Sequence, residues 1–133
     1  MSLGDQLSKI LGRVQTQMET TVRESIREVG HRMVDRSPVD SGKFINNWKG
    51  SEGSINTDTN SEPDKSGAAS HASIDAVADN WTPGETVYIT SSLPYAERIE
   101  RGWSGGAPKG VVGLTATEFG DILQEQLRKA KNG

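Results

Sequence analysis

The stretch LGDQLSKILGRVQTQMETTVRESIREVGHRMVDR, residues 3–36, decides the fold of this 133-residue chain. Its apolar residues recur at steps of three and four, which places them on one stripe of an α-helix. Ser2 and Asp5 have the spacing of a capping box, and Pro38 disfavours helix at Ser37. We therefore expect one helix from about residue 3 to residue 36. The stripe consists of Leu3, Leu7, Ile10, Leu11, Val14, Met18, Val22, Ile26, Val29 and Met33.

The stripe also contains an eleven-residue repeat, which averages about 3.67 residues per turn and lacks the drift that winds heptad helices into a left-handed coiled coil. A nearly straight helix lying on a sheet is the favoured interpretation. At about 1.5 Å per residue the helix is roughly 50 Å long, so it is expected to project past the core of so small a domain. The repeat has two series: Leu7, Met18 and Val29, then Leu11, Val22 and Met33.

Two glycines, Gly12 and Gly30, interrupt this helix and fall on one line along its side. Each costs about 1 kcal/mol relative to alanine. One interpretation is neutral variation on a solvated flank. The other is a smooth edge where the backbone of another subunit comes close.

Beyond the helix, residues 43–49 alternate in a way that predicts a strand, and residues 85–90 predict a second one. Between them, about residues 51–70 are rich in Ser, Gly, Asn, Asp and Thr, a composition that cannot form a packed core by itself. Helical spacing of apolar residues predicts a short helix over residues 70–80.

The C-terminal region predicts a second major helix over about residues 116–131. Thr115 and Glu118 have capping-box spacing, and Leu114 and Phe119 have the spacing of a hydrophobic staple. We expect a single α+β domain over residues 1–133. In it the long N-terminal helix and the C-terminal helix pack on one face of a small antiparallel sheet, which gains one or two further strands from the central segment.

Composition narrows the possible functions. With 32% hydrophobic and 5% aromatic residues, the chain has little material for a core, and self-association would supply more burial. A net charge of -3 argues against a general nucleic-acid binder, and the lack of cysteine excludes disulfides and thiolate metal sites. The sequence has no apolar run of bilayer length and no signal-peptide h-region, so a soluble protein is expected.

Candidate catalytic and metal patterns are weak. Asp58, Asn60, Glu62 and Asp64 alternate like an EF-hand loop, but Pro63 stands where that loop needs glycine. Ser41 to Lys43 resembles the end of a phosphate-binding loop without its upstream glycine. A hydrolase could use His31 or His71, yet no nucleophile elbow is present. No enzyme, cofactor or metal site is expected.

Three segments carry a resemblance to a known family: SPVDSGKFINNWKGS (37–51), LPYAERIERGWS (93–104) and APKGVVGLTATEF (107–119). Together they are similar to the neck and tail-completion proteins of tailed bacteriophages, the group that includes minor tail protein Z. That family has a long first helix, a Pro-Val-Asp-Ser/Thr-Gly turn and a Pro-Tyr-Ala segment followed by glutamate and glycine. The matching residues here are Pro38, Val39, Asp40, Ser41 and Gly42, then Pro94, Tyr95, Ala96, Glu100 and Gly102.

The resemblance implies a structural virion protein of the neck, which completes the tail and joins it to the head connector. It implies a cyclic homo-oligomer, with six copies favoured and twelve possible, whose closure needs two different surfaces on each chain. The partners would be tail tube or terminator proteins and connector proteins, with DNA only as cargo passing through the ring and no membrane. Assembly would occur in the host cytoplasm. A monomeric assembly chaperone or small protein-binding module, not retained in the virion, is the alternative.

Residues near the matching segments are the candidate interface. Trp103 follows the helix-ending Gly102 and precedes a flexible Ser-Gly-Gly run, a position typical of an interface anchor. Pro38, Asp40 and Gly42 are expected to form a structural turn in which Gly42 has positive φ. The full set of candidate interface residues is Trp103, Gly102, Ser104, Tyr95, Glu100, Trp48, Gly12 and Gly30.

Overall fold

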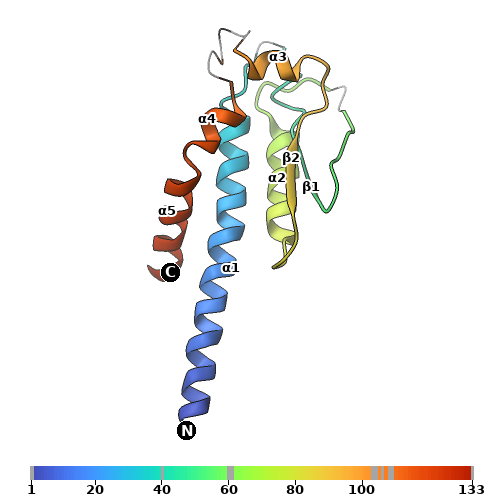
Figure 1. The fold of residues 1–133 in the computed structure, drawn as a ribbon. Coiled ribbons are helices and arrows are strands. Elements are labelled where there is room, and N and C mark those ends of the chain that lie inside the picture. The colour runs from blue at the N-terminus through green and yellow to red at the C-terminus, as the bar shows by residue number, and fades with distance from the viewer. Residues whose placement is uncertain are drawn as a thin grey trace.

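The protein folds around one long helix. A computed structural model describes residues 2–39, 41–59, 62–102, 105, 107 and 110–132. Helix α1 lies in the middle, with α5 on one side and α2 with the two strands on the other (Figure 1). The expected α+β class, with long N-terminal and C-terminal helices, is confirmed. The elements are α1 (Leu3–Asp35), β1 (Lys49–Glu52), α2 (Ala68–Asn80), β2 (Val87–Thr90), α3 (Ala96–Glu100), α4 (Val112–Ala116) and α5 (Phe119–Asn132).

Helix α1 has the expected extent and the expected start. The Ser2 hydroxyl accepts a hydrogen bond from the Asp5 amide, and the Asp5 carboxylate accepts one from the Ser2 amide, which completes the capping box. The N-terminal half of α1 projects beyond the rest of the molecule, as its length predicted (Figure 1). Packing against other elements begins only near the middle of the helix.

The sheet is smaller than expected and its first strand lies later in the sequence. Residues 43–48 form a turn in which the Asn47 amide bonds to the Phe44 carbonyl, and Phe44, Ile45 and Trp48 are all buried. The prediction of a strand over residues 43–49 was therefore wrong. The Phe44 and Trp48 rings do not alternate as in a strand, because they meet edge to face with their centroids 5.5 Å apart.

The two strands pair antiparallel, with Gly50 opposite Ile89, and these are the strands found among the described residues. Helix α2 covers β1 and confirms the helix predicted for residues 70–80, with two more residues at its start. A side chain at Gly50 would collide with Val77, since its Cβ would lie 2.7 Å from Val77 Cγ1. The absence of a side chain there lets α2 lie directly on the strand.

Helix α2 is also held against α1. Ile74 packs onto Gly30, where an added Cβ would lie 2.4 Å from Ile74 Cγ2. At the edge of this contact, the Arg27 guanidinium pairs with Asp75 and Asp79. The α1–α2 contact therefore has an apolar centre with charged groups at its margin.

The C-terminal region contains two helices where one was predicted. Thr115 lies inside α4 and its hydroxyl donates to the Val111 carbonyl, so Thr115 and Glu118 do not cap α5. Helix α5 begins at Phe119, three residues later than predicted. The capping box fails because the Glu118 carboxylate is paired with arginines of α1 instead.

The core lies at the end of α1 that carries α2, α3 and α4. The core cluster consists of Met33, Val34, Phe44, Ile45, Trp48, Ile74, Leu93, Ala107 and Val111.

Among the residues that the structure describes, no helix combines the length and the apolar character needed to cross a membrane.

Gly30→Ala should lower the free energy of unfolding by about 1–3 kcal/mol, because its methyl group overlaps Ile74. Gly12→Ala is the matched control on the same helix. Nothing lies within 4 Å of a Cβ at Gly12, so this change should raise stability by up to about 1 kcal/mol. Urea unfolding of both variants measures the difference, and equal effects at the two sites would contradict the packing described here.

Candidate interaction surface

A line of exposed apolar side chains follows the projecting half of α1. Six of them have exposed fractions between 45 and 71%, high values for large apolar residues on one helix face. Contiguous apolar surface of this kind marks an interaction site on a soluble protein. We call these residues the apolar track: Leu3, Leu7, Ile10, Leu11, Val14 and Met18.

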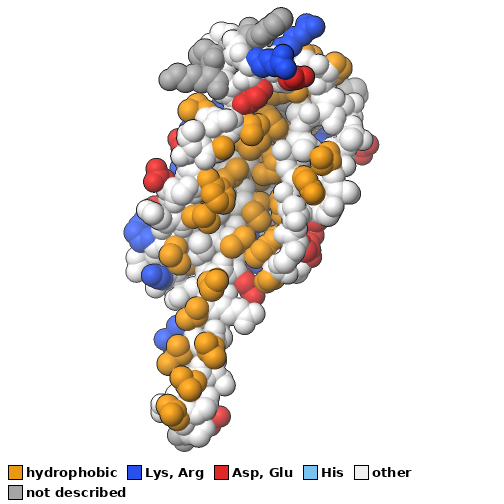
Figure 2. Space-filling view, viewed as in Figure 1, with side chains coloured by type: hydrophobic (Ala, Val, Ile, Leu, Met, Phe, Trp, Pro, Cys, Tyr) orange, Lys and Arg blue, Asp and Glu red, His pale blue; other side chains and the backbone are white. Residues whose placement is uncertain are grey.

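The apolar track leads into two hollows in the body of the molecule (Figure 2). The first, of about 430 Å³, lies where α1 passes the loop containing Trp81 and Pro83. The second, of about 400 Å³, lies between α1, β2 and α5, and we call it the apolar groove. Its floor is Val22, Ser25, Ile26 and Val29, and its walls are Val87, Ile89, Phe119 and Leu123.

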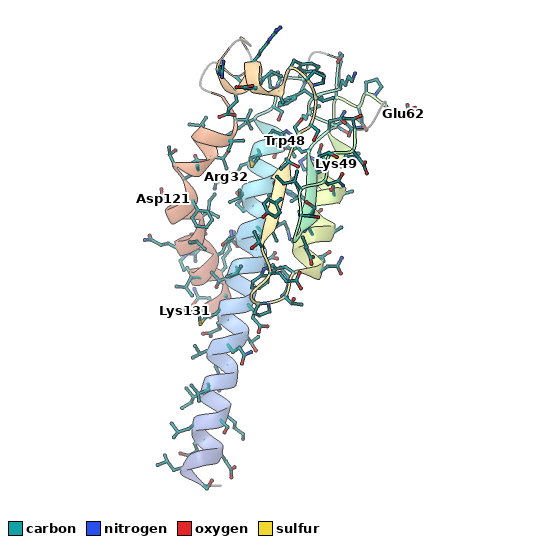
Figure 3. The ribbon with its side chains drawn as sticks, turned by 45° about the vertical axis from the view of Figure 1, so that its right-hand side comes forward. Arg32, Trp48, Lys49, Glu62, Asp121 and Lys131 are labelled. Carbon is teal, nitrogen blue, oxygen red and sulfur yellow. The ribbon has the colours of Figure 1, made fainter. Side chains whose placement is uncertain are left out.

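The α5 wall of the groove is positioned by an ion cluster around Glu118. Its carboxylate lies 2.6 Å from Arg36 Nη1 and 3.2 Å from Arg32 Nη1, and Arg36 also donates to the Thr115 hydroxyl. Figure 3 shows Arg32 between α1 and α5. Because Phe119 follows Glu118 directly, this cluster places Phe119 at the rim of the groove, where its side chain is half exposed.

The cluster changes the acidity of Glu118. The hydrogen bond from Arg36, supported by the bond from Arg32 and by the charges of both arginines, lowers the pKa of Glu118 from 4.5 to about 2, although partial desolvation opposes the shift. The pKa of the Arg36 guanidinium is raised by the same hydrogen bond. The carboxylate is therefore ionised throughout the ordinary pH range.

Glu100 has a structural role that organises the start of α4. Its carboxylate accepts hydrogen bonds from the amides of Val111, Val112 and Gly113 at 2.8, 2.8 and 2.9 Å. Burial alone would raise the pKa of Glu100, but these amides outweigh it and lower the pKa. The side chain thus ties α3 to α4 across the loop between them and is occupied within its own chain.

Of two predicted interface residues, Trp48 belongs to the core and Tyr95 is half-buried against it. Trp48 is 4% exposed, and its indole nitrogen donates to the Ser37 hydroxyl at 2.8 Å (labelled in Figure 3). Its ring packs edge-on against Phe44, which also contacts Tyr95. Burial raises the pKa of Tyr95. Trp48 is therefore covered within its own chain, whereas Tyr95 is only partly covered.

The two helix glycines have different surroundings. Gly30 is buried against Ile74 of the same chain, so the prediction that it meets another subunit was wrong. Gly12 faces open space and lines a wide hollow between α1 and the end of α5, together with Lys129 and Lys131. Of the pair, Gly12 alone remains available to a partner.

The predicted turn is present where the structure describes it. Gly42 has φ +83°, as expected, its carbonyl accepts a hydrogen bond from the Asp64 amide, and an added Cβ would lie 2.6 Å from the Lys65 nitrogen. Pro38 follows the end of α1, and Gly102 ends α3 with φ +85°. Trp103, Ser104 and Asp40 lie outside the described residues.

The two histidines occupy the α1–α2 contact. His31 Nε2 lies 2.8 Å from Asp75, His71 Nε2 lies 2.9 Å from Asp35, and the two rings meet edge to face. Within the described ranges, no group of three or more His, Asp or Glu side chains is placed to hold a metal ion. The site with the clearest chemical character is therefore the apolar track and its groove.

Sequence reasoning identified the residues of the track but assigned them to contact with the sheet. The apolar periodicity of α1 does not show which part of the stripe is packed against other elements and which part is exposed. Glu100 and Glu118 were also missed as anchors, because their partners lie far away in sequence. Both the exposure of the track and the partners of these glutamates depend on tertiary contacts, which the sequence pattern does not reveal.

Comparison with protein-family models, with curated proteins and with solved structures finds no match to this chain. Functional inference therefore rests on the surface described above and on the resemblance of the three sequence segments.

Glu118→Gln should lower the free energy of unfolding near neutral pH and abolish most of the pH dependence that this side chain contributes. A depressed pKa in the folded state means that the contribution is present above about pH 4.5 and is lost as the pH falls toward about 2. Urea midpoints of wild type and variant should therefore converge at low pH.

Glu97→Gln is the control, because Glu97 forms an exposed ion pair with Arg101 within a single helix region. It should change the urea midpoint little at any pH. A Glu118→Gln difference that stays constant from neutral to acidic pH would contradict the proposed ion cluster.

Proposed function

We propose that this protein is a structural subunit of a bacteriophage neck, which completes the tail and joins it to the head connector as part of a homo-oligomeric ring. The proposal combines the resemblance of segments 37–51, 93–104 and 107–119 to tail-completion proteins with one structural observation. That observation is the apolar track, which a single copy leaves uncovered.

The apolar track supports an assembly role on energetic grounds. Fully burying a Leu, Ile or Val side chain is worth about 1.5–3 kcal/mol relative to leaving it in water. Half of α1 presents such side chains along one face, while its other end is packed in the core. A chain with this arrangement gains stability when other chains cover the face, as in an assembled particle.

The body of the protein suits a rigid structural role. The α1–α2 contact around Gly30 and the Glu118 cluster join three helices, and Glu100 fixes the start of α4. We propose that Trp103, which follows Gly102 in the sequence, contacts a tail or connector protein.

A genetic experiment tests the proposal. In the phage genome that encodes this chain, interruption of the gene should yield complete heads and complete tails that remain unjoined in electron micrographs. Supplying purified protein to the lysate should restore joined particles that contain it. Joined infectious particles formed without the protein would contradict the proposal, and joined particles that lack the protein after rescue would favour the assembly chaperone.

Trp103→Ala provides a sharper version of this test. We expect the variant to fold normally but to fail in joining heads to tails, because loss of an aromatic anchor typically costs about 2 kcal/mol or more of binding. Circular dichroism and thermal unfolding check the fold, and the rescue assay checks joining. Unfolding of the variant would assign Trp103 to the core instead.

A further inference from the structure

We infer that two copies of the free protein pair antiparallel through α1, so that the projecting half of each helix lies over the apolar groove of the other. This inference is separate from the proposed ring. A two-fold contact closes on itself and cannot build a ring, so in a ring the same face would be covered by a different contact that replaces the pair.

The order of apolar residues along α1 supports an antiparallel pair. When residue i of one helix is placed opposite residue 36 − i of an antiparallel partner, the stripe matches itself about Met18. Every stripe residue except Leu11, which meets Ser25, then has an apolar counterpart. The pairs are Leu3 with Met33, Leu7 with Val29, Ile10 with Ile26, Val14 with Val22, and Met18 with Met18.

This register also brings the exposed half of α1 in one copy onto the apolar groove of the other. Ile10 is at the centre of the uncovered half of α1, and Ile26 is on the floor of the apolar groove between β2 and α5. In the pair, Ile10 and Leu7 enter the groove beside Ile89 and Phe119. The exposed helix and the unfilled groove thus cover each other, twice in each pair.

The directions in which the track and the groove face also favour a two-fold pair. The eleven-residue repeat keeps the apolar track and the groove floor on one side of a straight helix, and both are visible on the same face (Figure 2). Two patches that face the same way on one molecule can meet between copies only when these are related by a rotation near 180°. A 60° rotation, as in a six-membered ring, cannot bring them together.

Charged residues do not oppose the pairing. Lys9 and Arg27 would lie at the same level in this register, but the helical period places both on the side of α1 away from the stripe. Arg27 is held there by Asp75 and Asp79 of α2. Arg32 falls within the angular range of the stripe, opposite Gly4 in this register, and its charge is met by Glu28 and Glu118 of its own chain.

Cysteine cross-linking tests the register directly, since the natural chain has no cysteine. Under mild oxidation, Met18→Cys should form a disulfide-linked dimer. A mixture of Ile10→Cys and Ile26→Cys chains should form the mixed disulfide. Ile10→Cys alone should stay reduced, because the two copies of residue 10 would be roughly 24 Å apart along the helices. Lys9→Cys is the control for random collision.

Sedimentation equilibrium tests the pairing without oxidation. Wild type should be a dimer, and Leu7→Glu should weaken dimerisation at least about tenfold by placing a charge in the groove. Leu7 is exposed on the projecting half, so the monomer fold should be retained. Thr16→Glu adds the same charge on the opposite side of the helix and should leave the dimer unchanged.

Three results would overturn the inference: a monomeric wild type, an absent mixed disulfide, or a Leu7→Glu dimer as strong as wild type. Self-linked Ile10→Cys chains would also overturn it, because they indicate parallel helices, as a ring could have. That last outcome would leave the proposed neck function intact. The gene-interruption experiment tests that function separately, because it scores the joining of heads to tails and not the pairing of free chains.

Discussion

The structure depends on one constraint: a single straight apolar stripe runs along the whole of α1, but only part of it is covered by the rest of the chain. Toward the C-terminal end, Met33 and Val34 enter the core, and Gly30 admits Ile74 of α2. In the middle, Val22 to Val29 form the floor of a groove that β2 and α5 flank without filling. At the N-terminal end nothing described covers the stripe. The same sequence pattern therefore stabilises the fold at one end and leaves an uncovered apolar face at the other.

The arrangement of the smaller elements follows from this helix. The Glu118 cluster holds α5 beside α1, and Gly50 lets α2 lie on β1 while α2 also packs on α1. Glu100 connects α3 to α4 beside the core, because its carboxylate accepts hydrogen bonds from the amides at the start of α4. These contacts set the walls of the groove, so the rigidity of the body and the shape of the candidate interaction surface have common causes.

The sequence predicted much of the local structure and little of its tertiary arrangement. The α1 stripe, its Ser2 cap, the helix near residues 70–80 and the left-handed Gly42 could be inferred from spacing and turn chemistry. The strand predicted over residues 43–49 was wrong, because a turn that buries Phe44 and Trp48 gives nearly the same apolar pattern as a short strand. Thr115 and Glu118 had the spacing of a cap, but arginines far away in sequence compete for the carboxylate. The sequence predicted that α1 projects past the core, but the apolar track was assigned to contact with the sheet and was not among the candidate interface residues, because periodicity does not record which neighbours are absent.

Oxidation of the methionines by dilute peroxide tests the central claim, that the exposed face of α1 is covered in the associated protein. Met18 is the last residue of the apolar track and is exposed, whereas Met33 is buried in the core of each copy. Peptide mass spectrometry gives the rate for each residue. The account predicts that Met18 oxidises far faster than Met33 in dilute protein and becomes protected at high concentration and in particles, while Met33 stays slow throughout. A Met18 rate that is the same in the dilute, concentrated and particle-bound states would contradict it.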